Sequence, residues 1–304
     1  MAVMKQTLPS LLLGVTSLVL LVLNTLFWCA CLFVLALVKL LLPWRGIRVR
    51  LDAALNAIAC AWIACNSKWL GWTHPEPWDI GIDAQLNPRG WYLVNSNHQS
   101  WVDILVLQRL FLGRIPMLKF FLKQQLIYVP VIGLAWWALD FPFMKRHSSA
   151  ALKARPELRL QDLETTRRAC EKFSQIPTSV MNFAEGTRFR TYKHEAQRSP
   201  YGHLLKPKAG ALALALNVMG GQFQSLLDVT IVYPEGVPTF WQFTCNIRSR
   251  VIVRVRERPI PAQFCSGDYG GDERFRDDFQ QWLGQIWTDK DAQIAALLAP
   301  RIRG

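Results

Sequence analysis

The feature that most constrains this chain is a nearly uncharged apolar run at residues 8–43, in which Lys39 is the only charged residue. Apolar runs of about 18 residues or more are typical of membrane helices. A secretory signal would have a shorter apolar core and a small-residue cleavage site. A core helix of a soluble protein is seldom apolar on every side over such a length. We therefore expect residues 1–50 to form a membrane anchor.

The length of this run does not decide how it crosses the membrane. As one helix it would measure about 54 Å, whereas the hydrocarbon layer of a bilayer is about 30 Å thick. We expect either one span with an interfacial continuation or a short hairpin bent near Asn24. Arg45, Arg48 and Arg50 follow the run, and this asymmetry places the C-terminal side in the cytoplasm. The next stretch, residues 51–73, is expected to form an interfacial or packing helix.

Composition indicates an acidic partner. Hydrophobic residues make up 51% of the chain, mean hydropathy is +0.13, the net charge is +13 and the pI is about 9.7. Anionic lipid and nucleic acid are the obvious candidates. Nucleic acid is disfavoured, since the basic residues form no recognisable recognition module. The seven cysteines are scattered without metal-ligand spacing, so we expect a reducing compartment and no metal site.

Residues 74–304 alternate between β-rich and helical patterns. The pattern predicts strands at 91–96, 178–183, 227–233 and 249–256, and helices at 100–112, 160–174, 207–218 and 275–298. This alternation predicts one cytoplasmic α/β domain with a mostly parallel central sheet flanked by helices. Ligands of such sheets gather at the carboxyl ends of the strands, and two polar motifs follow predicted strands.

The first motif is "NHQSWVD" at 97–103, directly after an apolar run. If His98 lies in the turn before a helix and Asp103 in its early turns, the carboxylate can accept a hydrogen bond from the imidazole and leave the other ring nitrogen as a base. Ser100 is near, but the chain has no G-x-S-x-G elbow. Alternatively, His98 is a strand-end histidine and Asp103 a carboxylate favoured by the helix dipole.

The second motif is "VMNFAEGTRFR" at 180–190, again a strand followed by polar residues. Gly186 permits a tight turn close to an anion. Thr187 adds a hydroxyl and Arg188 a fork of donors, so the turn is a candidate phosphate cradle. Glu185 could bind a substrate hydroxyl or hold Arg188. The alternative is a surface turn with an ion pair.

Two further stretches combine cations with apolar residues. In 120–146, Lys123 and Arg146 bracket an apolar segment that we interpret as the wall of an acyl site, although its length also permits a second membrane span. In 248–258, five arginines fall on even positions, at 248, 250, 254, 256 and 258. In an extended strand these would share one face. We expect this face to meet anionic lipid or an acidic donor carrier, with an ordinary solvated face as the alternative.

Taken together, the motifs resemble the 1-acylglycerol-3-phosphate acyltransferase family of glycerolipid acyltransferases. That family is marked by four blocks: H-x-x-x-x-D, an apolar block ending in Arg, F-x-E-G-[ST]-R, and a strand with Pro. Here "NHQSWVD", "FPFMKR", "FAEGTR" and "IVYPEG" occur in that order over residues 90–236. The stretches "KQQLIYVPVIG" and "WWALDFPFMKRHS", between the first and third blocks, look most like a bacterial inner-membrane branch. Met144 and Lys145 depart from the commoner second block, which leaves the acceptor head group open.

The resemblance implies a role for each matching residue. His98 would be the catalytic base and Asp103 its orienting partner. The acceptor phosphate and glycerol would be bound by Lys123, Arg146, Glu185, Gly186, Thr187 and Arg188. The block containing Pro234 would line the acyl-donor side.

The implied reaction moves a fatty acyl group from an acyl-thioester to the 2-hydroxyl of 1-acylglycerol 3-phosphate, without an acyl-enzyme. It requires no cofactor or metal, because acyl-coenzyme A or acyl-acyl carrier protein serves as co-substrate. We expect the protein at the cytoplasmic (inner) membrane of a bacterium, with its catalytic domain facing the cytoplasm. The alternatives are an acyltransferase for another lysophospholipid and a membrane-tethered lipid-binding protein without catalysis.

Overall fold

The computed structural model describes residues 7–42, 44–74, 76–144, 164 and 176–299. The α-helices are α1 (Leu8–Leu41), α2 (Arg45–Thr73), α3 (Val102–Phe111), α4 (Ile132–Ala138), α7 (Thr191–Gln197), α8 (Gly210–Met219), α9 (Phe240–Thr244) and α10 (Glu273–Leu298). The strands are β1 (Asp79–Asp83), β2 (Tyr92–Ser96), β3 (Leu118–Phe120), β4 (Leu122–Lys123), β5 (Phe143–Met144), β6 (Ser179–Phe183), β7 (Ser225–Val232) and β8 (Ile252–Arg258). Short 3-10 helices occupy η1 (Gln124–Tyr128) and η3 (Ala262–Cys265).

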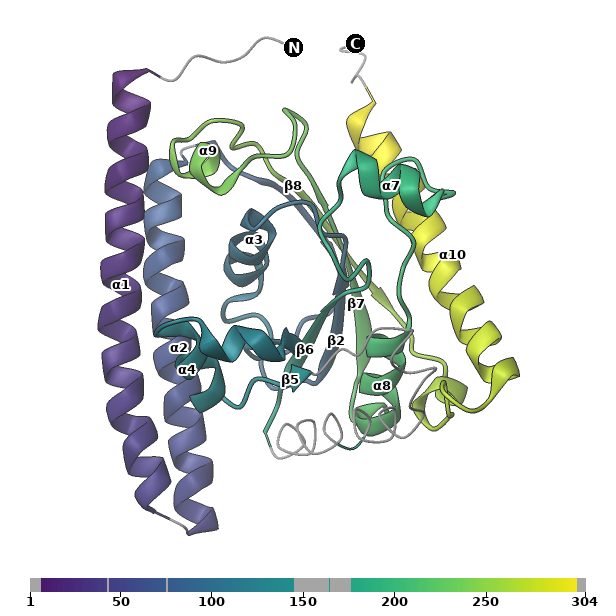
Figure 1. Cartoon of the computed structure of the whole chain (residues 1–304), viewed down its shortest axis with the longest axis horizontal. Helices are drawn as coiled ribbons and strands as arrows, with labels where there is room; N and C mark the ends of the chain where they lie inside the picture. Colours follow the sequence, from purple (N-terminus) through teal and green to yellow (C-terminus); the bar gives the residue numbers. More distant parts are fainter. Residues whose placement is uncertain (1–6, 43, 75, 145–163, 165–175, 300–304) are drawn as a thin grey trace.

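The apolar N-terminus forms one arm of an antiparallel helical hairpin with α2 (Figure 1). α1 runs unbroken through Asn24, so the alternative of a bend there is wrong; the chain reverses between α1 and α2 instead. The amide of Asn24 donates to Asn66 Oδ1 of α2 at 2.7 Å, and the indole of Trp62 donates to Thr25 Oγ1 at 3.1 Å. These interhelical bonds satisfy polar groups that would otherwise favour a break in the helix.

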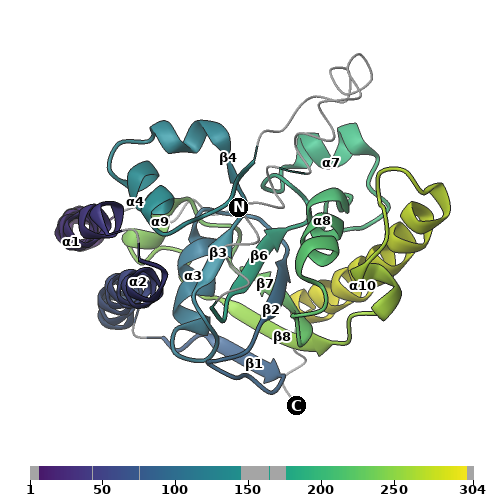
Figure 2. The ribbon, with the colours of Figure 1, turned by 90° about the horizontal axis from the view of Figure 1, so that it is seen from below.

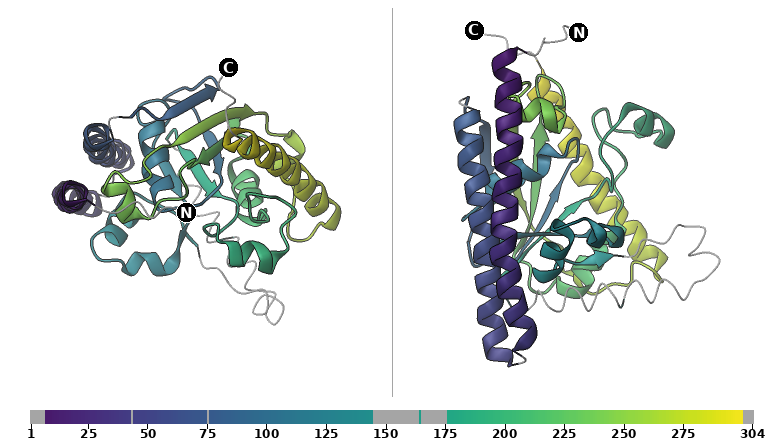
Figure 3. Two further views of the ribbon diagram at one scale, coloured as in Figure 1. Left: turned by 90° about the horizontal axis from the view of Figure 1, so that it is seen from above. Right: turned by 60° about the vertical axis from the view of Figure 1, so that its left-hand side comes forward.

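The hairpin lies along one side of the rest of the molecule, and the end of α1 and the start of α2 extend past it (Figure 3). Near its N-terminus α1 touches the end of α9, where Ser17 Oγ donates to the carbonyl of Thr244 at 3.3 Å. Near its C-terminus, Lys39 forms ion pairs with Asp52 at 2.5 Å and Asp140 at 2.6 Å. α1 therefore presents one long side, and not its whole circumference, to a surrounding phase. Because α2 begins at Arg45, the boundary expected at residue 50 falls inside this helix.

A six-stranded sheet forms the centre of the molecule, in the order β1-β8-β7-β2-β6-β3. Every neighbouring pair is parallel except β7–β8, which is antiparallel. All residues of β2 and β7 are buried, as expected for central strands covered on both faces. Helix α3 covers one face, and α8 and α10 cover the other (Figure 2). The predicted α/β fold with a mostly parallel sheet is confirmed.

The predicted basic strand is shorter than its pattern indicated. Arg248 has a positive φ of 55°, and β8 begins only at Ile252. The expectation that five arginines share one strand face is therefore wrong for the arginines at 248 and 250. Of the remaining three, Arg258 contacts Asp228 and Asp289, and Arg254 contacts Asp79. Local acidic residues thus offset much of the charge on this face.

The segment 120–144 is broken into short elements: β4, η1, α4 and β5. Within the described residues, α1 is the one helix long and apolar enough to cross a membrane, so the alternative of a second span in this segment is wrong. The buried alanines Ala135 and Ala138 of α4 pack in one cluster with Cys29, Leu32 and Ala36 of α1. The segment thus joins the α/β domain to the hairpin. The predicted helix 160–174 lies outside the described residues apart from Glu164.

Candidate active site

Three buried parallel strands end at the same edge of the sheet. In the register of β2, Ser96 lies opposite Phe183 of β6 and Val229 of β7. The polar segments 97–103 and 184–190, which follow β2 and β6, therefore emerge side by side. β7 continues to Val232, which carries residues 233–234 to the same edge. The two motifs that lie about 80 residues apart in the sequence are neighbours here.

The structure brings His98 and Asp103 together at this edge. His98 Nδ1 lies 2.8 Å from Asp103 Oδ2, and that oxygen also accepts the backbone N–H groups of Gln99 at 2.6 Å and Ser100 at 2.9 Å. The carboxylate is fully buried in the first turn of α3, whereas the side chain of His98 is 13% exposed. Its ring stacks on Phe183 at 3.9 Å between centroids. Because an ionised carboxylate accepts only, Nδ1 carries the proton of the neutral ring and Nε2 holds a free lone pair.

A tyrosine directly after β7 completes the surroundings of the carboxylate. The hydroxyl of Tyr233 donates to Asp103 Oδ1 at 2.6 Å. Burial, together with the charge of Asp103, holds the pKa of this phenol well above its usual range, so it stays a donor. Sequence reasoning missed Tyr233; the one available signal was its place between the apolar end of a strand and Pro234.

Glu185 holds the backbone of His98 in place. Its Oε1 accepts the backbone N–H of His98 at 2.8 Å, and its Oε2 accepts that of Leu205 at 3.0 Å. The side chain is fully buried, and burial raises the pKa of its carboxyl to about 7, although the two amides oppose the shift. Glu185 thus fixes the backbone that carries His98, and a direct contact with an acceptor stays a prediction.

The residues after Glu185 form a basic rim next to the histidine. Gly186 has a φ of 67° and donates its N–H to Phe183 O at 2.8 Å, which closes a tight turn. Its amide is therefore occupied by the turn. The guanidinium of Arg188 lies over the exposed ring of Trp101, 4.9 Å from its centroid. Lys193 of α7, which sequence reasoning also missed, donates to Thr187 Oγ1 at 2.5 Å.

Of the other predicted residues, the structure describes Lys123 and Pro234 but not Arg146. Lys123 is exposed on β4, where it pairs with Met144 of β5. Arg146 lies outside the described residues, two positions after Met144. Pro234 is half-buried and directly follows Tyr233. The structure thus places Lys123 next to the strand that leads to Arg146, while the phosphate contact predicted for both remains a prediction.

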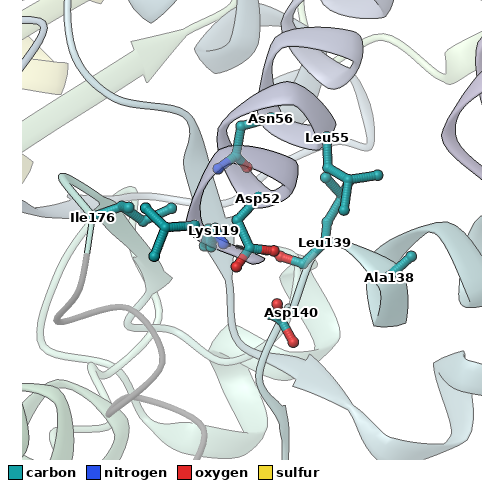
Figure 4. A pocket seen from close by; sticks show the side chains of 9 residues that line it. Asp52, Leu55, Asn56, Lys119, Ala138, Leu139, Asp140 and Ile176 are labelled. Atoms are coloured by element: carbon teal, nitrogen blue, oxygen red, sulfur yellow. Dashed lines mark hydrogen bonds between the residues drawn. The ribbon is translucent and has the colours of Figure 1, made fainter. Parts of the chain in front are cut away.

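A small cavity between α2, β3 and α4 is not part of this site (Figure 4). It is lined by Asp52, Asn56, Lys119 and Asp140, among others, and not by His98 or Asp103. Lys119 Nζ donates to the carbonyl of Leu139 at 2.9 Å. The room inside is about 20 Å³, enough for one water molecule. The cavity belongs to the contact between the hairpin and the domain.

Comparison with known proteins assigns this fold and site to a family. A model of the acyltransferase family matches residues 81–238, a range that contains His98, Asp103, Glu185 and Tyr233. The chain belongs to the acyltransferase family. The resemblance to the 1-acylglycerol-3-phosphate acyltransferases inferred from the four sequence blocks is thereby confirmed, whereas the hairpin and α10 lie outside the matched range.

Individual relatives agree with this assignment. The human 1-acyl-sn-glycerol-3-phosphate acyltransferase gamma is 25% identical over 57% of this chain and 44% of its own length. The Arabidopsis thaliana 1-acyl-sn-glycerol-3-phosphate acyltransferase 3 is 23% identical over 66% of this chain and 52% of its own length. The chain thus spans about half the length of these relatives. The crystal structure of the 1-acyl-sn-glycerophosphate (LPA) acyltransferase PlsC from Thermotoga maritima shares the fold, with a TM-score of 0.54, 17% identity, and coverage of 96% of this chain and 98% of that chain.

Proposed function

We propose that this acyltransferase moves a fatty acyl group from an acyl-thioester to the 2-hydroxyl of 1-acylglycerol 3-phosphate and so produces phosphatidic acid. The observation that carries the proposal is the 2.8 Å contact between His98 Nδ1 and the buried carboxylate of Asp103. It leaves Nε2 of a partly exposed ring as a base, which is what attack by a substrate hydroxyl requires. A protein that only bound lipid would have no use for a histidine held in this tautomer.

Each proton transfer and bond change of the proposed reaction can be assigned to a group of the protein or the substrates. His98 Nε2 removes the proton of the acceptor hydroxyl while its oxygen attacks the thioester carbonyl. The resulting tetrahedral oxyanion collapses, the C–S bond breaks, and the thiolate leaves with the proton returned from the imidazolium. Asp103 stabilises the imidazolium in between. General base catalysis of this kind contributes roughly 10²–10⁴-fold, and a thioester needs no prior activation by a protein nucleophile.

The basic rim supports an acceptor that carries a phosphate. Arg188 is held over Trp101, and Lys193 is held at Thr187, so two cations and a hydroxyl lie within a few residues of the strand end next to His98. A guanidinium binds phosphate through two parallel hydrogen bonds, and a lysine adds a point charge. We assign the phosphate of the acceptor to this rim, with Lys123 and Arg146 as further candidates.

We propose that the outward side of α1 contacts the membrane that supplies the acceptor. Its large apolar side chains remain exposed to solvent along the helix: Leu12, Val19, Leu23, Leu26, Phe27, Val34 and Leu37. Contiguous exposed apolar surface of this kind marks a lipid or protein contact. The arginines after α1 favour the cytoplasmic leaflet of a bacterial inner membrane.

The test is a substrate panel. Purified full-length protein is incubated with several lysophospholipids and with either acyl-coenzyme A or acyl-acyl carrier protein, and products are identified by mass spectrometry. We expect thioester-dependent formation of phosphatidic acid. A different diacyl product would identify another lysophospholipid as the acceptor. Binding of lipid with no product from any pair would show that the protein is not an acyltransferase of this class.

A further inference from the structure

We propose that Tyr233 is a positioning residue that sets how tightly the His98–Asp103 pair holds its proton. The feature behind this inference is the second oxygen of Asp103, which faces away from His98 and meets the tyrosine hydroxyl. The inference deepens the proposed function, because it rests on His98 acting as the base. Its consequence is that the pH range in which the base is free depends on a residue that touches neither substrate.

The hydrogen bonds of Asp103 are divided between its two oxygens. Oδ2 accepts from His98 Nδ1 and from the amides of Gln99 and Ser100, whereas Oδ1 accepts from Tyr233 at 2.6 Å. Within the described part of the chain, His98 and Tyr233 are the only side chains that bond this carboxylate. A buried carboxylate depends on its donors for stabilisation. Apart from His98 itself, Tyr233 is therefore the one partner whose donor can be removed by substitution without altering the backbone.

Tyr233 is held firmly relative to the histidine. Asn97, the residue before His98, bonds both backbone groups of Ile231: its Nδ2 donates to the carbonyl at 2.8 Å, and its Oδ1 accepts the N–H at 2.9 Å. This two-point contact ties the end of β7 to the end of β2, two residues before Tyr233. Pro234 then restricts the chain on the other side. The hydroxyl is thus placed by the sheet edge and not by a mobile loop.

The direction of the effect follows from the charge on Asp103. A hydrogen-bond donor to Oδ1 stabilises negative charge on that oxygen. Less negative charge is then left on Oδ2 to stabilise the imidazolium of His98. Without it, the pair as a whole binds a proton more tightly. The other charged groups near the pair stay in place: Glu185 behind the His98 backbone, Arg188 on Trp101, Arg190 at the carbonyl of Gln99, and the exposed Glu235.

The experiment compares full-length wild type with Tyr233→Phe, which removes only the hydroxyl. The imidazole of His98 is titrated by NMR on histidine-labelled protein in detergent micelles, with His98→Gln to assign the signal among the five histidines. We expect the apparent pKa of His98 to rise by roughly half to one unit. kcat/KM should fall roughly three- to ten-fold on the acid side of the profile, where the base is mostly protonated, by less at pH 7, and hardly at all near pH 9. Replacing Tyr233 with 3-fluorotyrosine, a more acidic donor, should move the titration the opposite way.

The matched control is Tyr92→Phe. Tyr92 is also buried, and its hydroxyl also takes part in hydrogen bonds, but it lies at the opposite end of β2. Its loss should leave the titration of His98 unchanged. An unchanged His98 titration in Tyr233→Phe, an equal shift in Tyr92→Phe, or an activity loss equal at every pH would overturn the proposal. If wild type transferred no acyl group, the proposed function would fail, while the titration would still decide the role of Tyr233.

Discussion

The sheet edge that holds His98 and Asp103 differs from the N-terminal hairpin in which groups it buries and which it exposes. At the edge, two carboxylates are buried and satisfied: Asp103 accepts four hydrogen bonds and Glu185 two. On the outer side of α1, apolar groups are exposed. The first arrangement fixes His98 in one tautomer, and the second leaves the apolar surface for which we propose a membrane contact. Changes at the edge should therefore affect chemistry, whereas changes on α1 should affect where the chemistry takes place.

The largest effect that separates the two regions is expected for Asp103→Asn. An amide cannot stabilise the imidazolium, and it would present an N–H where the buried carboxylate accepts several donors. We expect kcat to fall by roughly 10²-fold or more, while binding to vesicles, measured by flotation, is unchanged. A variant that lost vesicle binding and activity in equal measure would show that the two regions are not separable.

The converse change is Leu12→Glu combined with Leu23→Glu on α1. Each of these exposed leucines would lose roughly 1.5 kcal/mol or more of apolar transfer energy, so vesicle binding should weaken by roughly a hundred-fold. Activity on a short-chain acceptor dissolved in detergent should persist. Leu298→Glu, an exposed site on α10, is the control that should leave flotation unaltered. Equal flotation of all three proteins would remove α1 from the membrane contact.

A smaller effect is expected for Arg188→Ala at the rim. Loss of one charge-assisted hydrogen bond removes roughly 1.5–3 kcal/mol, so the KM for the phosphate-bearing acceptor should rise by roughly ten- to a hundred-fold. The KM for the acyl donor should change little. Steady-state kinetics with a monoacylglycerol provide the control: impairment as large with this neutral acceptor would assign Arg188 a structural role.

The smallest effect concerns Glu185 and pH. Its pKa of about 7 in the folded protein lies above the ordinary value, so the folded state binds the proton more tightly than the unfolded state. The stabilisation is complete below about pH 4.5 and is lost as the pH rises to about 7, with an upper limit of about 3 kcal/mol. Between pH 5 and pH 7, the midpoint temperature of thermal unfolding should decrease more for wild type than for Glu185→Gln. Parallel decreases would show that Glu185 is already ionised at pH 5.

Sequence reasoning succeeded where the deciding contacts are local. The pairing of His98 with Asp103 depends on a turn followed by a helix, which the five-residue spacing and the apolar pattern both indicate. Tyr233 could not be found in this way, because its contact with Asp103 spans 130 positions and requires β7 to lie next to β2. Local sequence patterns do not predict which strands are neighbours in a sheet.

The hairpin shows the same limit. Asn24 in an apolar run resembles a break when α1 is considered alone, but Asn66 of α2 satisfies its side chain. The prediction of a basic strand face also depended on the local pattern alone. Its even-numbered arginines fit an extended face, yet Arg248 adopts a positive φ and Arg258 finds Asp228 and Asp289 from β7 and α10. For Asn24 and Arg258, the deciding partners are distant in the sequence.

The central claim is that His98 is the base of an acyl transfer, and one assay tests it directly. Purified wild type and His98→Ala, matched for folding by circular dichroism and for vesicle binding by flotation, are given 1-acylglycerol 3-phosphate and an acyl-thioester, and phosphatidic acid is measured by mass spectrometry. If His98 is the base, the wild-type protein forms product and the variant forms less by roughly 10²–10⁴-fold. Wild-type turnover in a folded, membrane-bound His98→Ala protein would contradict the mechanism.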